Sequence, residues 1–298
     1  MKHITRILLP VLLAVFLVGC TVPEPPAQIA ATTLPVYEFT SRLCEGTGIT
    51  VTRLVTEEVS CLHDYSLNVR QVKAAEAAEL IVISGGGLED FMADILRDAN
   101  VIDASGFRIG FHDMTHVHSH EEEKHHENDG HHHETDPHVW LSPENALVMV
   151  DNIRGALSIQ YPEYAETITK NAFVLFDELK DLKNYGEETL SDLSCRDLIT
   201  FHDGFSYFAE AFDLHILEAV EEESGSEASA KELIHLIEEV DHHHLPAVFT
   251  EKSGSVSAAG IIARETGCGS YSLDMAMSGD SYFEAMYHNI NTIKEALG

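Results

Sequence analysis

Short apolar runs alternate with amphipathic segments through the first third of the chain. Residues 29–34, 50–54 and 80–84 look like strands, and apolar positions at helical spacing predict helices over residues 36–43, 71–78 and 88–99. The run from Leu80 to Ile83 is apolar throughout, which is typical of a strand buried on both faces. Alternation of strands with helices predicts a parallel sheet covered by helices, so this region is expected to form an α/β lobe.

The same alternation resumes in the last third of the chain. The strand candidates there are residues 198–201, 214–217, 247–250 and 271–273. The predicted helices between them are residues 205–211, 230–240 and 255–266. The pattern therefore predicts a second α/β lobe with its own parallel sheet.

Between the two lobes lies a segment whose apolar side chains recur every three or four residues, with charged residues between them. These positions are Tyr164, Ile168, Ala172, Leu175, Leu179 and Leu182. A single helix through this segment would be about 45 Å long at 1.5 Å per residue, which is enough to span two lobes. We expect an N-terminal lobe at 29–160, a linking helix at 161–193 and a C-terminal lobe at 194–298.

Glycine punctuates the first lobe at Gly85-Gly86-Gly87, directly after a predicted strand. A phosphate-binding loop would need Gly-x-Gly-x-x-Gly or a Gly-Lys-Ser/Thr ending, and the sequence has neither. The triplet therefore predicts a tight turn.

The start of the chain has the features of an export signal. Positive charge precedes an apolar run at residues 7–18, which is short of the roughly 20 residues that a membrane-spanning helix needs, so residues 1–19 are expected to be a signal peptide. Leu17-Val18-Gly19-Cys20 resembles the lipobox of bacterial lipoproteins, in which the cysteine is acylated; the alternative is an ordinary signal peptide with an incidental Cys20. The proline-rich residues 20–28 favour a tether from a lipid anchor, and hence an extracytoplasmic protein held at the cell membrane.

The charge balance excludes one class of partner. The chain has 50 acidic residues against 18 Lys and Arg, a formal charge of −32. Such a surface repels phosphate backbones, so we expect no nucleic-acid partner.

Four cysteines remain besides Cys20, two in each half of the chain. An exported protein sits where disulfides persist, and the economical pairing joins Cys44 to Cys61 and Cys195 to Cys268; the alternative is free buried thiols. No Cys-x-x-Cys pair is present, so a cysteine zinc site is not expected.

Residues 112–133 form a low-complexity segment rich in histidine, glutamate and aspartate. It contains too little apolar surface to build a core and is expected to be a mobile loop. Imidazoles suit zinc, copper or nickel better than calcium or magnesium, so the loop predicts contact with a transition metal.

Three isolated histidines suggest a defined metal site. His63, His138 and His202 lie where strands are expected to end, and ligands bind beyond the carboxyl ends of strands in open α/β sheets. Three imidazoles with one carboxylate would give a tetrahedral shell suited to zinc. Asp274 is the expected fourth ligand, with Glu251 in reserve, and the flanking carboxylates are candidates to orient the imidazoles: Asp64, Asp136 and Asp203.

Together these segments resemble the metal-binding receptors of bacterial ABC transporters for zinc and manganese. The resemblance is carried by His63-Asp64-Tyr65, by Asp136-Pro137-His138-Val139-Trp140, by the block from Phe201 to Phe208, and by Ser272-Leu273-Asp274-Met275. Gly85-Gly86-Gly87-Leu88-Glu89 and Glu227-Ala228-Ser229 also resemble structural blocks of the family. The sequence departs from the family at Cys61-Leu62, where many relatives carry Pro or Gly nearby, and at Ala228, which replaces a more usual Pro.

The resemblance implies a monomeric receptor, not an enzyme, that binds metal between two lobes whose joining helix limits hinge motion. It would deliver the ion to an ABC permease with its ATPase. Histidine at position 202, together with the His-rich loop, resembles the zinc branch, so Zn²⁺ is the expected cargo and Mn²⁺ the alternative. A surface adhesion protein that uses metal structurally is a second alternative. A zinc hydrolase is a weaker one, because no His-Glu-x-x-His motif is present.

Overall fold

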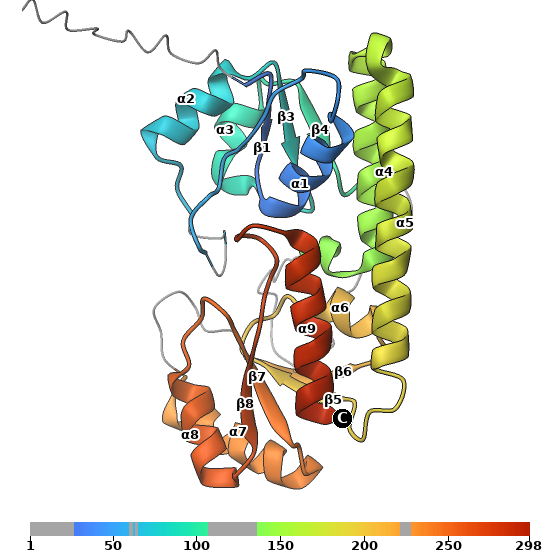
Figure 1. The fold of residues 1–298 in the computed structure, drawn as a ribbon. Coiled ribbons are helices and arrows are strands. Elements are labelled where there is room, and N and C mark those ends of the chain that lie inside the picture. The colour runs from blue at the N-terminus through green and yellow to red at the C-terminus, as the bar shows by residue number, and fades with distance from the viewer. Residues whose placement is uncertain (1–26, 60–61, 63–64, 107–135, 221–227) are drawn as a thin grey trace, which may run out of the picture.

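The structure is a computed structural model that describes residues 27–59, 62, 65–106, 136–220 and 228–298. Its N-terminal lobe contains a four-stranded parallel sheet in the order β2-β1-β3-β4 (Figure 1). The strands are β1 (Ile29–Ala31), β2 (Val51–Arg53), β3 (Leu80–Ile83) and β4 (Val101–Asp103). The helices around it are α1 (Leu34–Leu43), α2 (Val69–Ala77) and α3 (Ala93–Leu96), with a 3₁₀ turn at Asp90–Met92.

The C-terminal lobe repeats this arrangement with a parallel sheet in the order β6-β5-β7-β8. Its strands are β5 (Asp197–Thr200), β6 (His215–Ala219), β7 (Ala247–Glu251) and β8 (Gly269–Leu273). Its helices are α6 (Ser206–Ala211), α7 (Ala230–His243), α8 (Ser257–Thr266) and α9 (Tyr282–Leu297). In each sheet the strand that comes first in the chain, β1 or β5, lies between the strands that come second and third. The two lobes therefore share one topology. The predicted fold class, two α/β lobes with parallel sheets, is confirmed.

Two antiparallel helices lie along one side of the molecule. Figure 1 shows α4 (Pro143–Gln160) and α5 (Ala165–Thr189) side by side along the N-terminal lobe, and α5 continues beyond α4 to the C-terminal lobe. The helix that the sequence predicted over residues 161–193 is a 3₁₀ turn at Pro162–Tyr164 followed by α5. α5 contacts α1 in the first lobe and α9 in the second, and its buried stripe matches the predicted apolar positions from Ile168 to Leu182.

The carboxyl ends of the two sheets face each other. Leu34, just beyond β1, donates its backbone N–H to the carbonyl oxygen of Met277, beyond β8, at 3.1 Å. Arg53, at the end of β2, donates to the carbonyl oxygen of Gly279 at 2.8 Å. In such sheets ligands bind beyond the carboxyl ends, where the strand order reverses, so the space between the lobes is the place to look for a site.

The glycine triplet after β3 is the predicted tight turn, since Gly85, Gly86 and Gly87 all have positive φ angles of 68–90°. A Cβ atom on Gly85 would lie 2.0 Å from Oδ1 of Asp103. A side chain at this position would therefore clash with Asp103.

The cysteines differ from the expected disulfide pattern. Cys44, Cys195 and Cys268 are free thiols, so the expected bond between Cys195 and Cys268 is absent. Cys61 lies outside the described residues. Burial raises the pKa of the Cys44 thiol to about 12, which keeps it protonated and unreactive.

Among the residues described above, no helix is long and apolar enough to cross a membrane. The predicted signal peptide, Cys20 and the His-rich loop at 112–133 lie outside the described residues.

Candidate metal site

His138 is held by a carboxylate at the entrance to α4. It lies at the N-cap of the 3₁₀ turn Val139–Leu141, not at the end of a described strand as the sequence suggested. Oδ1 of Asp136 accepts the His138 backbone N–H at 2.9 Å and lies 2.8 Å from the ring Nδ1. Burial alone would raise the pKa of the Asp136 carboxyl, but its hydrogen bonds with the ring and backbone of His138 and its electrostatic interaction with that ring hold the pKa below its ordinary value.

An ionised carboxylate only accepts hydrogen bonds, so the proton of the His138 ring belongs on Nδ1. The other nitrogen, Nε2, then offers its lone pair. It is buried and has no hydrogen-bond partner among the described residues. Histidines that bind metals in proteins are oriented in this way by a carboxylate behind the ring.

His202 has a similar partner, supplied by the register of the second sheet. Thr200 of β5 is paired with Phe249 of β7, and two residues further along each strand come His202 and Glu251. Nδ1 of His202 therefore lies 3.0 Å from Oε1 of Glu251, whose side chain is only 4% exposed. This edge, between β5 and β7, is where the strand order of the lobe reverses.

The two imidazoles meet edge to face, with ring centroids 5.2 Å apart. Gly204 lies against both: a Cβ there would be 2.7 Å from Cδ2 of His202, 2.8 Å from Nδ1 of His138 and 2.7 Å from Cε of Met275. Only a residue without a side chain fits this position. Gly204 was not among the site residues predicted from the sequence, although it lies within the His202-Asp203-Gly204-Phe205 block.

Asp274 lies at the same edge, one residue beyond β8. Its Oδ1 accepts the backbone N–H of Ala276 at 2.8 Å, and its Oδ2 lies 3.1 Å from Nζ of Lys252. The pKa of Lys252 is raised, first by its hydrogen bond to Asp274 and then by the charge of the same carboxylate. A metal bound by this carboxylate would therefore compete with an ammonium group.

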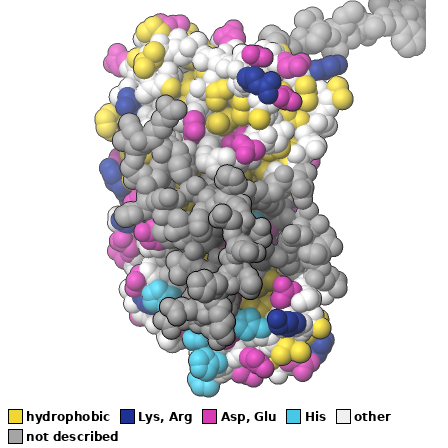
Figure 2. All heavy atoms as spheres, turned by 180° about the vertical axis from the view of Figure 1, so that it is seen from behind, with side chains coloured by type: hydrophobic (Ala, Val, Ile, Leu, Met, Phe, Trp, Pro, Cys, Tyr) yellow, Lys and Arg dark blue, Asp and Glu magenta, His cyan; other side chains and the backbone are white. Residues whose placement is uncertain are grey.

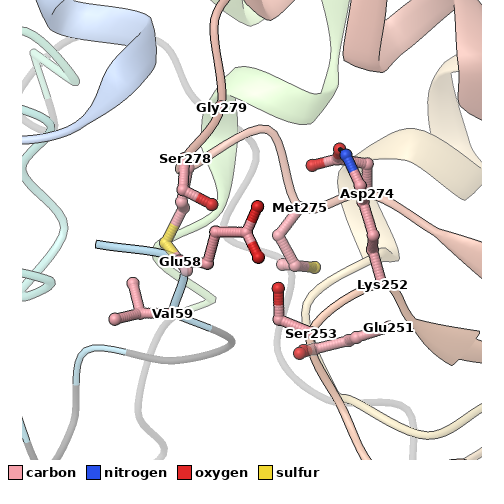
Figure 3. A pocket seen from close by; sticks show the side chains of 10 residues that line it. Glu58, Val59, Glu251, Lys252, Ser253, Asp274, Met275, Ser278 and Gly279 are labelled. Atoms are coloured by element: carbon pink, nitrogen blue, oxygen red, sulfur yellow. Dashed lines mark hydrogen bonds and ion pairs between the residues drawn. The ribbon is translucent and has the colours of Figure 1, made fainter. Parts of the chain in front are cut away.

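A pocket between the lobes opens beside these residues. Glu58 and Val59 line it from the N-terminal lobe, and Glu251, Lys252 and Asp274 from the C-terminal lobe. Figure 3 shows the Glu58 carboxylate extending into the pocket from the segment before residue 60. The pocket thus combines three carboxylates with one lysine, an arrangement that suits a cation.

The first predicted ligand, His63, lies outside the described residues. Its described neighbours are anchored: Leu62 is 1% exposed, and the Tyr65 ring packs edge to face on Phe91 with centroids 5.3 Å apart. Val59, four residues before His63, lines the pocket. The structure therefore brings His138, His202, Glu251 and Asp274 to one edge and leaves His63 as a prediction.

A buried clamp fixes the site between the lobes. Nε1 of Trp140 donates to the carbonyl oxygen of Met275 at 2.8 Å, and the Tyr282 hydroxyl donates to the carbonyl oxygen of Trp140 at 2.8 Å. Both aromatic side chains are fully buried in a hydrophobic core that is continuous through both lobes, α4 and α5. Wide separation of the lobes would break this core.

Comparisons with known proteins find similarity over nearly the whole chain. The model of one family, described as zinc-uptake complex component A, periplasmic, matches residues 29–296. The "Zinc-binding protein AdcA" of Streptococcus pyogenes serotype M3 (strain ATCC BAA-595 / MGAS315) is 28% identical over 91% of this chain, and the "Zinc-binding lipoprotein AdcA" of Streptococcus pneumoniae (strain ATCC BAA-255 / R6) is 30% identical over 99%. The chain spans only 56% and 61% of these two relatives.

Among solved structures, the Zn(II)-bound ZnuA-like domain of Streptococcus pneumoniae AdcA superposes with a TM-score of 0.73 at 26% identity. The match covers 90% of this chain and 98% of that domain. The similarity therefore extends over both lobes.

Proposed function

Because this chain belongs to the family of periplasmic zinc-uptake complex component A proteins, we propose that it is an extracytoplasmic receptor that binds Zn²⁺ between its lobes and delivers it to an ABC permease with its ATPase. The observation that carries the proposal is the pair of adjacent imidazoles, buried His138 and partly buried His202, each with a carboxylate at Nδ1. A carboxylate behind each ring is how metal-binding histidines are oriented in proteins.

The proposed ligands are His63, His138, His202 and Asp274. The unpartnered Nε2 of buried His138 supports a metal there, because an unsatisfied ring nitrogen in a protein interior costs free energy that coordination would recover. Glu251 is better placed behind His202 than as a ligand, since it already faces Nδ1 of that ring. A shell of three nitrogens and one oxygen at roughly 2.0–2.2 Å suits Zn²⁺.

Nitrogen ligands also favour zinc over manganese, which is better matched to carboxylate, carbonyl and water oxygens. Manganese remains the alternative cargo to be tested. Release should be easier in acid, because protonated imidazoles cannot coordinate.

We further propose that Cys20 carries the lipid that anchors the protein and that the segment 112–133 gathers metal through weak, exchangeable histidine contacts. The pneumococcal relative is described as a lipoprotein, which supports an anchor for this chain. The protein is proposed to act as a monomer.

Competition for zinc and for manganese with a chromophoric chelator tests the proposal. We expect one tight zinc site in the signal-free protein, lost in the variant His63→Ala/His138→Ala/His202→Ala and retained when residues 112–133 are deleted. The matched control is His215→Ala/His235→Ala, which removes two exposed histidines of the C-terminal lobe and should keep the tight site.

Persistence of tight zinc binding in the triple variant would refute the proposed ligands. Tight binding of manganese without zinc would refute the cargo. Metal that leaves only when the protein unfolds would point to a structural role, the basis of the adhesion alternative.

A further inference from the structure

A second group of metal-ligating side chains lies at the end of α7, on the surface of the C-terminal lobe. Glu239, His242 and His243 place one ligand atom each such that all three atoms lie within 4.8 Å of one another. Nε2 of His243 is 3.4 Å from Oε2 of Glu239, and the rings of His242 and His243 are 4.7 Å apart. We propose that these three residues form a separate, solvent-exposed site for a divalent transition metal such as Zn²⁺.

The spacing along the helix explains why the three side chains converge. Residues three and four positions apart share a helix face, so Glu239 faces both His242 and His243. Leu236 and Val240 are the buried residues of α7 and fix its rotation on the core, which leaves His242 and His243 on the side that faces solvent. The ligand atoms of a tetrahedral zinc ion lie about 3.3 Å apart, so small side-chain rotations suffice to bring the three atoms onto one ion.

The backbone at this end of the helix is ordered by its own hydrogen bonds. His244 adopts a left-handed conformation with φ 52° and ends the helix, and the N–H of Leu245 donates to the carbonyl oxygen of Val240 at 3.0 Å. Because the backbone at this helix end is already fixed, metal binding would order only the side chains and would cost less conformational entropy. The helix C-terminus also carries partial negative charge, which favours a cation.

This site is distinct from the one between the lobes. The chain passes from the end of α7 into β7 at Ala247, and β7 runs about 13 Å to Glu251 at the opposite edge of the sheet. Figure 2 shows histidine side chains at the end of the C-terminal lobe that lies away from the N-terminal lobe. The two sites can therefore load independently.

Two imidazoles and one carboxylate leave at least one position of a zinc ion to water. The side chains of His243 and Glu239 are 33% and 26% exposed, so bound metal would exchange readily with solvent. We infer weaker binding here than between the lobes, where His138 is buried and His202 and Asp274 are only 18% and 13% exposed. Such a site holds metal at the surface without committing it to transport.

The test treats the full mature chain with diethyl pyrocarbonate, which modifies accessible histidines. Protection of each histidine is measured at free zinc concentrations that a chelator buffer sets. Trypsin cleaves after Lys231 and Lys252, so one peptide holds His242, His243 and the internal control His235. We expect His242 and His243 to become protected together, at a higher free zinc concentration than the tight site of the chelator competition assay needs. His235, on the same helix but outside the cluster, should stay reactive.

Glu239→Gln should raise the free zinc concentration that half-protects His242 and His243 by at least about tenfold. Loss of a residue that only supports a metal ligand already weakens metal binding by that factor. His235→Ala is the matched control and should leave protection of the pair unchanged. Circular dichroism of each variant checks that α7 remains folded. If His242 and His243 stay as reactive as His235 while the chelator competition assay still detects the tight zinc site, the surface site is refuted and the interlobe site stands; an unchanged midpoint in Glu239→Gln would likewise refute the surface site.

Discussion

The hydroxyl of Tyr282 donates a 2.8 Å hydrogen bond to the backbone carbonyl oxygen of Trp140, and both side chains are fully buried. Trp140 lies two residues after His138, whereas Tyr282 begins α9 in the other lobe. The bond therefore ties one proposed ligand to the lobe that supplies His202 and Asp274. A receptor built in this way must admit metal by local rearrangement of loops, because separating its lobes would expose this core.

Tyr282→Phe tests the contribution of that bond. Removing the hydroxyl leaves the buried carbonyl of Trp140 without this donor, and we expect the free energy of unfolding to fall by about 1–3 kcal/mol. Urea denaturation of the metal-free protein measures the change. Tyr185→Phe is the matched control: its hydroxyl donates to Asn291 at 2.7 Å on the exposed surface and should contribute less. Equal losses in the two variants would contradict a special role for the clamp.

Gly204→Ala should weaken zinc binding. The added methyl group would meet His202, His138 and Met275 at 2.7–2.8 Å, so the two imidazoles must move apart or tilt. Misplaced ligands reduce affinity, and we expect a loss of at least about tenfold in the chelator competition assay. Gly260→Ala in α8 has open space around its Cβ and should bind zinc like the wild type. Unchanged affinity in Gly204→Ala would mean that this edge does not hold the metal.

The pattern of apolar residues predicted those helices and strands whose buried positions recur regularly along the chain. β3 is a continuous apolar run and α5 carries an uninterrupted stripe, so each was recognisable without knowing its partners. β4 was missed because Val101–Asp103 is too short to show alternation. The predicted helix at 88–99 is broken into a 3₁₀ turn and the four-residue α3.

Two missed helices did carry signals. α4 begins with the N-cap Ser142 followed by Pro143, and α9 begins with the N-cap Ser281, whose hydroxyl accepts the N–H of Glu284. Serine before an apolar periodic segment, with proline at the first helical position, indicates a helix start. These helices could have been predicted from the sequence.

The site was only partly predictable, because its geometry depends on contacts between distant segments. Sequence placed His202 correctly after a strand, and it identified Asp136 as a partner of His138. It could not place Glu251 behind His202, since that contact follows from the register of β5 against β7. The pairing of Asp274 with Lys252 likewise appears only once two strand ends are adjacent.

The buried carboxyl of Glu89 makes a pH-dependent contribution to stability. It accepts hydrogen bonds from Thr32, Ser84 and Gly85, yet burial raises its pKa from 4.5 to about 7. Between pH 4.5 and pH 7 the folded protein keeps the Glu89 carboxyl protonated, whereas the unfolded chain releases that proton. Its contribution is therefore fully present below pH 4.5 and is lost as the pH rises through 7.

Glu89→Gln removes this titration. We expect the stability difference between the wild type and the variant to shrink as the pH rises from about 4.5 to 7, as measured by urea denaturation of the metal-free proteins. Glu188→Gln, on the exposed face of α5, provides the reference for an accessible carboxyl. A stability difference that does not shrink over this interval would show that the pKa of Glu89 is not raised in the folded protein.

Lys252→Gln distinguishes Asp274 from Glu251 as the fourth ligand. The ammonium group lies 3.1 Å from Oδ2 of Asp274 and must yield that oxygen if zinc binds it, so removing the charge should tighten zinc binding. Lys252 is 59% exposed, and exposed ion pairs contribute about 0.2–1 kcal/mol, so the gain should be about 1.5- to fivefold. Asp274→Asn should abolish this gain, and Lys294→Gln, which disrupts a surface pair with Asp192, should not produce it. If Lys252→Gln tightens binding equally in the presence of Asp274→Asn, the lysine acts only through the general field, and Asp274 is not a ligand.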